Sequence, residues 1–210
     1  MGGAIRQLTG KGTNVKVVNL TDGEPTPCGS SEIRQKESLE SASILGFEQE
    51  ILEYKNRDLK YDIEKRNKIA QIIRYCKPLA IFTHFSNDSH PDHSETSKIV
   101  DDAVFAARLT NTDIPGEPFR PRKVYYYFAV HLKKVIEPDF FITLTEEEHS
   151  LKMRALEAYK SQFIDNKDNE KVFEYIRTRD RYWGFIAGSE YAEGFMSREA
   201  VNIDSIGNLI

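Results

Sequence analysis

The sequence predicts an α/β fold, because short apolar runs typical of buried strands alternate with segments whose apolar residues recur at helical spacing. Polar loops with chemically reactive side chains follow two of these runs, where the active sites of parallel sheets lie. We therefore expect a Rossmann-like three-layer sandwich with a mainly parallel sheet and a C-terminal extension of further strands and helices. Since no linker or repeat divides the chain, we expect one domain over residues 1–210.

The first half of the chain provides the alternating pattern. Its expected strands are Val15–Leu20, Glu50–Tyr54 and Leu79–His84. Its expected helices run from Ser31 to Gly46, from Asp62 to the residue before Pro78, and from Ser94 to Arg108. Glycine commonly follows the last turn of a helix, and a proline disfavours helical conformation in the residue before it, so Gly46 and Pro78 set two of these ends.

The later third supplies the expected extension. Val124–Val130 and Phe140–Thr143 are rich in aromatic and β-branched residues, which favours strands. Thr145–Glu148 has the pattern of a capping box and predicts that a helix begins there. After a polar loop, Val172–Ala187 has the pattern of a last long helix.

Composition excludes several classes of function. A formal net charge of -4 argues against nucleic acid as the main partner, since phosphate binding needs clustered Lys and Arg. Cys28 and Cys76 are the only cysteines, so neither a disulfide framework nor a cysteine zinc site is expected. The chain contains no apolar run of roughly 18 residues, and Met1–Arg6 has no apolar stretch typical of a signal peptide, so we expect neither a membrane span nor secretion. We expect a cytoplasmic protein without a membrane partner.

The run Ser89–His93 places two imidazoles around a carboxylate, directly after an expected strand. Neutral histidine is a good zinc ligand, and a second imidazole three positions away can donate a proton or stabilise an oxyanion. Asp92 can orient one ring through its Nδ1–H. These residues suit hydrolysis by a metal-bound water. The alternative is structural: His90 and His93 cap the next helix, with Pro91 in its first turn.

Arg34 lies early in an expected helix, where its charge opposes the helix dipole. One explanation is that it holds an anionic or hydroxyl-rich substrate. The alternative is an i, i+3 ion pair with Glu37. Of the remaining histidines, His84 could be either a core residue or a ligand, and His131 and His149 are predicted to be isolated surface residues.

Three segments in this order, Thr21–Glu24, Glu32–Glu37 and His90–His93, resemble the LmbE/PIG-L family of zinc-dependent N-deacetylases. Leu156–Phe163 and Tyr191–Phe195 are similar to its branch of bacillithiol-pathway N-acetylglucosaminyl-malate deacetylases. The resemblance implies that His93 ligates zinc or another divalent metal and that His90 stabilises the oxyanion or acts as an acid. It also implies that Asp92 orients His90 and that Arg34 contacts the substrate.

The family resemblance implies removal of an N-acetyl group from a small molecule that contains N-acetylglucosamine, by a homo-oligomer. The family's first motif, His-Pro-Asp-Asp, supplies two more zinc ligands and the general base, and it does not occur in this sequence. Met1–Ile5 resembles the start of the helix that follows that motif. We therefore expect a chain that begins one strand late and has little or no deacetylase activity. The alternative is a non-catalytic homologue that binds sugars or nucleotides in the same cleft.

Overall fold

The computed structural model describes residues 1–131 and 134–202. The chain divides into two compact units. Unit 1 combines Met1–Lys60 with Phe141–Gly194, and unit 2 combines Tyr61–Phe140 with the segment that starts at Phe195. The prediction of one domain over residues 1–210 stays a prediction.

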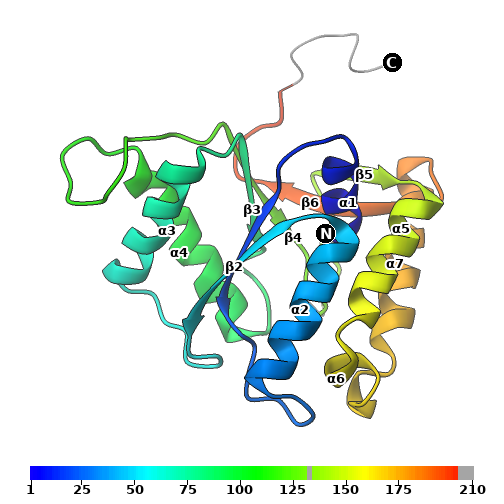
Figure 1. The fold of residues 1–210 in the computed structure, drawn as a ribbon. Helices are drawn as coiled ribbons and strands as arrows, with labels where there is room; N and C mark the ends of the chain where they lie inside the picture. Colours follow the sequence, from blue (N-terminus) through cyan, green and yellow to red (C-terminus); the bar gives the residue numbers. More distant parts are fainter. Residues whose placement is uncertain (132–133, 203–210) are drawn as a thin grey trace. The chain divides into compact units, whose positions relative to one another are not determined.

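Unit 1 contains a parallel pair of strands, β1 (Lys16–Thr21) and β2 (Glu48–Tyr54), aligned from Lys16↔Glu48 to Asn19↔Ile51. Its helices are α1 (Gly2–Gly10), α2 (Ser31–Leu45), α5 (Glu146–Glu157), α6 (Lys160–Phe163) and α7 (Val172–Ala187), with a 3₁₀ turn, η1 (Lys167–Asn169), before α7. Helices α1 and α2 pack against α5 (Figure 1). The capping signals act as predicted: Gly46 ends α2 with a φ of 78°, and Thr145 and Glu148 form a capping box at α5.

Unit 2 contains α3 (Ile63–Cys76), β3 (Ala80–His84), α4 (Pro91–Ala107) and β4 (Lys123–Tyr127). Helices α3 and α4 lie side by side (Figure 1). Strands β3 and β4 pair in parallel from Ala80↔Lys123 to His84↔Tyr127. The carboxyl ends of both strands therefore bring His84 and Tyr127 to the same edge, beside the loop that leads into α4.

The α/β class is confirmed, but the prediction of a mainly parallel sheet is wrong in part. The strand order β3-β4-β6-β5 includes β5 (Phe140–Leu144) and β6 (Tyr191–Ser197), and β6 runs antiparallel to β4 at Tyr127↔Phe195. After α7 the chain turns back at Gly188, whose φ is 71°. Gly184 permits this return, because a Cβ there would lie 2.4 Å from the Glu190 carbonyl oxygen. The return of β6 depends on contacts distant in sequence, so local patterns did not predict it.

Unit 1 holds a buried group of charged side chains. Lys152 Nζ lies 2.5 Å from an Asp180 oxygen and 2.7 Å from a Glu193 oxygen. Glu193 also accepts the backbone N–H groups of Gly3 and Ala4, at 3.3 and 2.9 Å, in the first turn of α1. The surface prediction for His149 is wrong: its side chain is buried and stacks on Tyr191 with ring centroids 3.8 Å apart.

Unit 2 holds a buried arginine, Arg74, that binds backbone carbonyls rather than a carboxylate. Its guanidinium donates to the carbonyl oxygens of Ala107 (3.0 Å), Leu109 (2.6 Å), Gly116 (2.9 Å) and Ile114. Carbonyls at and just after the end of a helix lack intrahelical partners, and a cation there also matches the helix dipole. Arg74 thus fastens the loop after α4 to α3.

Replacing Arg74 with methionine is expected to lower the free energy of unfolding of unit 2 by about 2–4 kcal/mol, because buried carbonyls lose charged donors. Urea unfolding followed through the tyrosines of unit 2 measures this loss. The matched control is Arg120→Met, at an exposed position of the same loop, which should change stability by less than about 0.5 kcal/mol. Equal effects of the two substitutions would contradict the role assigned to Arg74.

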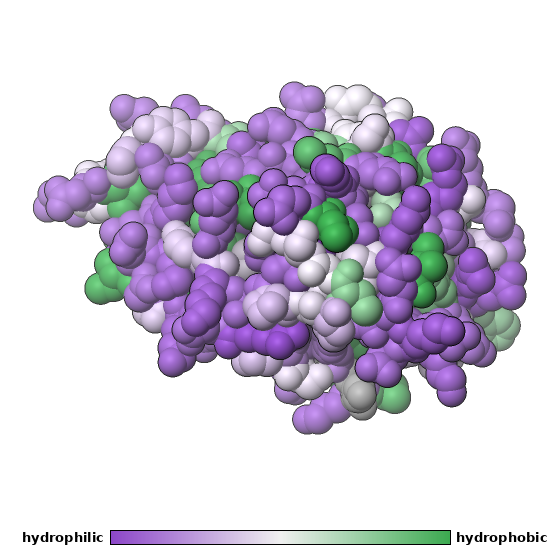
Figure 2. Space-filling view, turned by 60° about the horizontal axis from the view of Figure 1, so that its bottom comes forward, coloured by the Kyte–Doolittle hydropathy of each residue, from purple (hydrophilic) through white to green (hydrophobic). Residues whose placement is uncertain are grey.

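The face shown in Figure 2 is mainly hydrophilic, with apolar residues in separate small patches. Within residues 1–131 and 134–202, none of the helices has the length and apolar character needed to cross a membrane.

Candidate functional site

Four imidazole rings gather around the passage from β3 to α4. The ring centroids of His84 and His93 lie 4.1 Å apart, and those of His93 and His90 lie 4.6 Å apart, both pairs stacked at 20°. The ring of His131 lies 5.3 Å from His90 and 5.6 Å from His93, so the prediction that it is isolated is wrong, although it is exposed as expected. Unit 2 thus brings four of the chain's five histidines together.

His90 is the N-cap residue of α4, and Pro91 occupies the first turn, which confirms the capping alternative for His90. For His93 that alternative is wrong, because His93 lies within the helix. Its Nδ1 accepts the backbone N–H of Asp92 at 3.2 Å, so Nδ1 carries no proton and the neutral ring is protonated at Nε2. The capping bond therefore leaves Nε2–H as a donor. This bond comes from the backbone N–H of Asp92 and not from its carboxylate, so it is not the expected contact of the carboxylate with a ring Nδ1–H. The Asp92 side chain is buried, and its role in orienting a ring stays a prediction.

His93 lies in the first turn of α4, with its Nδ1 3.2 Å from an oxygen of Asp88. The approach is oblique, so Nδ1 makes no well-aligned hydrogen bond in this conformation. Burial lowers the pKa of His93, and the Asp88 carboxylate partly opposes that shift. The ring is therefore neutral at pH 7.

Asp88 was not predicted as a site residue from the sequence. A signal was available, since an Asp side chain often accepts the backbone N–H two residues later. Asp88 Oδ1 does so, with the N–H of His90 at 2.8 Å.

Tyr127, on β4, approaches the other end of the ring cluster. Its hydroxyl lies 3.0 Å from His84 Nε2. Burial, together with the imidazoles of His93 and His90, lowers the pKa of His84 well below its ordinary value. Burial raises the pKa of Tyr127. Both groups are neutral near pH 7, so the His84–Tyr127 side of the ring cluster is uncharged.

These shifts predict an acid-side loss of stability. In the unfolded chain His84 and His93 titrate near pH 6.5, so between their lowered folded pKa values and about 6.5 the unfolded state binds more protons, and stability falls as pH falls. The loss is at most about 1.4 kcal/mol per group for each pH unit. Urea unfolding at about pH 7.5 and about pH 5.5 measures the loss, and His84→Gln should reduce it. An unchanged pH dependence in that variant would contradict the assignment.

The family resemblance implies zinc at His93, and a zinc site needs three or four protein ligands. Among residues 1–131 and 134–202, no group of three or more His, Cys, Asp or Glu side chains is arranged to hold a metal ion. These side chains do not fit a zinc ion by themselves, so zinc, or another divalent metal, stays a prediction.

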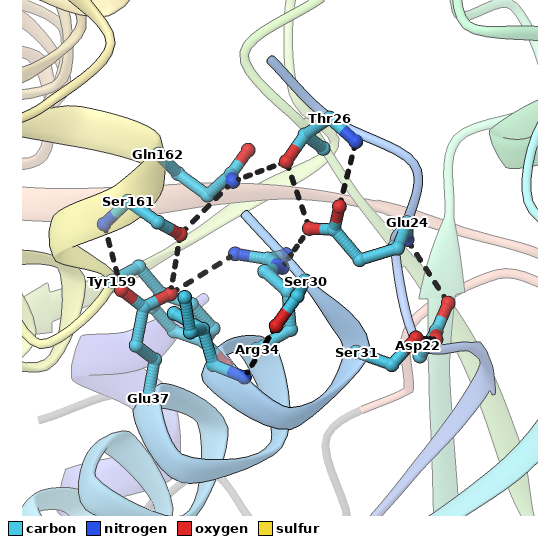
Figure 3. A network of polar contacts seen from close by, with 12 residues as sticks. Asp22, Glu24, Thr26, Ser30, Ser31, Arg34, Glu37, Tyr159, Ser161 and Gln162 are labelled. Atoms are coloured by element: carbon cyan, nitrogen blue, oxygen red, sulfur yellow. Dashed lines mark hydrogen bonds and ion pairs between the residues drawn. The ribbon is translucent and has the colours of Figure 1, made fainter. Parts of the chain in front are cut away.

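Arg34, on α2 of unit 1, lies between two carboxylates (Figure 3). Its Nε is 3.6 Å from a Glu24 oxygen, and its Nη1 is 3.8 Å from a Glu37 oxygen, which confirms the predicted i, i+3 pair. The guanidinium also lies over the ring of Tyr159, 4.9 Å from its centroid. Nε and Nη1 are buried without a hydrogen-bond partner.

Both carboxylates are held by hydrogen bonds from their own neighbours. Glu24 accepts the N–H and O–H of Thr26 at 2.7 and 2.8 Å, and Glu37 accepts the N–H and O–H of Ser161, both at 2.7 Å. Gln162 Nε2 joins the two halves through Thr26 and Ser161, at 2.9 and 3.1 Å (Figure 3). The positive charge of Arg34 is therefore compensated twice within unit 1.

Gly23 lies close to Nη2, the remaining guanidinium nitrogen of Arg34. Its φ is +82°, and a Cβ at this position would lie 2.9 Å from Arg34 Nη2. Glycine is therefore required here by backbone conformation and by the close approach of Arg34. The loop and the arginine fit each other only with this residue in place.

Comparison with known proteins finds deacetylases. Residues 1–104 match the family described as PIG-L: GlcNAc-PI de-N-acetylase. The diacetylchitobiose deacetylase of Thermococcus kodakarensis is 30% identical over 211 residues, which cover 92% of this chain and 76% of that protein.

Solved structures show the same similarity. A conserved protein from Thermus thermophilus has a TM-score of 0.88 and 31% identity, over 96% of this chain and 89% of that one. The N,N'-diacetylchitobiose deacetylase from Pyrococcus horikoshii, complexed with an inhibitor, has a TM-score of 0.82 and 29% identity, over 100% of this chain and 83% of that one. The deacetylase resemblance is thus confirmed, and these relatives do not single out the bacillithiol branch.

Proposed function

We propose that this chain, which belongs to the PIG-L family of de-N-acetylases, removes the acetyl group from an N-acetylglucosamine-containing small molecule by amide hydrolysis. Its family makes the chain an amide-hydrolysing enzyme. The N-acetylated amino sugar is the proposed part, and N,N'-diacetylchitobiose is the first candidate, because two relatives carry it in their names. The metal, the cytoplasmic location and the homo-oligomer remain predictions.

The observation that carries the proposal is the fixed orientation of His90. When an amide is hydrolysed, its carbonyl oxygen gains negative charge, and a donor already in place stabilises that charge. The bond from the Asp92 N–H to His90 Nδ1 holds the ring so that Nε2–H is such a donor. The neutral ring of His93 beside it provides a second nitrogen that can accept a proton or bind a metal.

For Arg34 we keep the role implied by the family, contact with the substrate. Because Glu24 and Glu37 already compensate its charge, uncharged hydroxyl groups suit it better than a third anion. This favours a neutral sugar such as a disaccharide over the malate conjugate of the bacillithiol pathway.

Replacing Arg34 with lysine is expected to raise the KM for N,N'-diacetylchitobiose about tenfold and to change kcat less than about threefold, because the planar donor is lost and the charge is kept. Steady-state kinetics measures both constants. Arg177→Lys, at an exposed position of the same unit, is the matched control and should leave KM unchanged. An unaltered KM in Arg34→Lys would remove Arg34 from the substrate site.

The proposed function is tested by measuring acetate released from N,N'-diacetylchitobiose, with added zinc, and from an acetyl-lysine peptide for comparison. We expect acetate from the sugar only. Because His93 is the single zinc ligand that the family implies here, we expect turnover well below that of the Pyrococcus horikoshii enzyme assayed beside it. Sugar binding without acetate release would instead identify the non-catalytic homologue, and absence of both would refute the proposal.

A further inference from the structure

Asp88 contacts both the N-cap residue and the first turn of α4. Its Oδ1 accepts the backbone N–H of His90 at 2.8 Å, and its Oδ2 lies 3.2 Å from His93 Nδ1. The side chain is only 3% exposed, so water is largely excluded as a partner for the carboxylate. Each oxygen thus has a separate contact, and the second is with the histidine to which the family resemblance assigns a metal.

We propose that Asp88 is a positioning residue that fixes the tautomer of His93, with the proton on Nδ1 and the lone pair on Nε2. An ionised carboxylate only accepts hydrogen bonds, so the nitrogen that faces it must carry the proton. A neutral imidazole has one N–H, which leaves Nε2 as the acceptor or ligand atom. A carboxylate behind an imidazole also raises the basicity of the opposite nitrogen.

The packing around His93 limits the other ways to orient the ring. The rings of His84 and His90 stack against its face, with centroids 4.1 and 4.6 Å away. Stacked rings do not hydrogen-bond in the plane of His93, so they do not select which nitrogen is protonated. Asp88 Oδ2 lies 3.2 Å from Nδ1, and although the two groups are not well aligned for a hydrogen bond, its negative charge favours the proton on Nδ1.

The isosteric substitution Asp88→Asn is expected to change which nitrogen of His93 carries the proton. The His90 N–H still needs an acceptor, so the amide oxygen takes the place of Oδ1. The amide NH₂ then faces His93 Nδ1, which must present a lone pair to it. The proton of His93 is expected to move to Nε2, although the shape of the side chain is unchanged.

Long-range ¹H–¹⁵N correlation NMR on the full chain reads the tautomer directly, with the His93 signals assigned by their loss in His93→Gln. We expect Nδ1–H in the wild type, Nε2–H in Asp88→Asn, and no change in Asp113→Asn, an exposed carboxylate of the same unit. Nε2–H in the wild type, or an unchanged tautomer in a folded Asp88→Asn, would overturn the proposal. If Asp88→Asn does not fold, the wild-type tautomer alone decides.

Enzyme kinetics distinguishes a positioning role of Asp88 from a merely structural one. The His93 tautomer itself does not depend on the proposed function, whereas its use in catalysis rests on that function. With N,N'-diacetylchitobiose, Asp88→Asn is expected to lower kcat by about 10²- to 10⁴-fold with little change in KM, as a wrong histidine tautomer does in other hydrolases. If the wild type released no acetate, the proposed function would fail, whereas the NMR result would still decide the role of Asp88.

Discussion

Replacing His90 with alanine is expected to slow acetate release by about 10²- to 10³-fold, the usual cost of removing one donor to an oxyanion. The physical reason is the loss of Nε2–H, which the Asp92 N–H holds in place through Nδ1. The rate of acetate release at saturating sugar measures the effect, since the lost contact acts on the transition state.

His90 is also the N-cap of α4, so alanine removes a cap worth about 1 kcal/mol as well. His90→Asn separates the two effects, because asparagine is a good N-cap and lacks the imidazole donor. We expect His90→Asn to keep the stability of the wild type and to lose as much activity as His90→Ala. Full activity in His90→Asn would show that His90 only caps the helix.

Replacing Lys152 with methionine is expected to lower the free energy of unfolding of unit 1 by about 3–5 kcal/mol, the usual cost of removing one partner from a buried ion pair. Asp180 is fully buried, Glu193 is nearly so, and Lys152 Nζ contacts both carboxylates. Burial acts to raise the pKa of Glu193, but the charge of Lys152 and the N–H of Ala4 lower it on balance. Without Lys152, two buried carboxylates remain with insufficient compensation.

Urea unfolding followed by the fluorescence of Trp183, which lies in unit 1, measures this loss. Lys171→Met, at an exposed position of the same unit, is the matched control and should cost less than about 0.5 kcal/mol. A Lys152→Met protein as stable as the control would contradict the assigned role of the buried charges.

The elements that could be predicted from the sequence are those with local signals. Asp62 caps α3 by accepting the N–H of Lys65 at 2.8 Å, and Gly46 and Thr145 mark helix ends where their residue types predict them. The antiparallel return of β6 could not be predicted in this way. It pairs Tyr125 with Ser197, residues far apart in sequence, and its own sequence carries a glutamate and a glycine.

The sequence predicted which residues belong to the candidate site better than it predicted the contacts between them. The spacing of His90 and His93 indicated either a helix cap or a reactive pair, and the cap is confirmed for His90. The contacts of Asp88 and His131 depend on how the loop folds back, which the motif does not encode. For His149 a signal existed: with Lys152 and Met153 it shares the buried face of α5, at helical spacing.

The most direct test of the account is a single-turnover experiment with zinc added and the chain in excess over N,N'-diacetylchitobiose, followed by mass spectrometry of the sugar. This design detects hydrolysis even when turnover is slow. We expect the wild-type chain to convert the sugar to a product with a free amine and His90→Asn not to do so. No amine from the wild type, or equal amounts from both proteins, would contradict it.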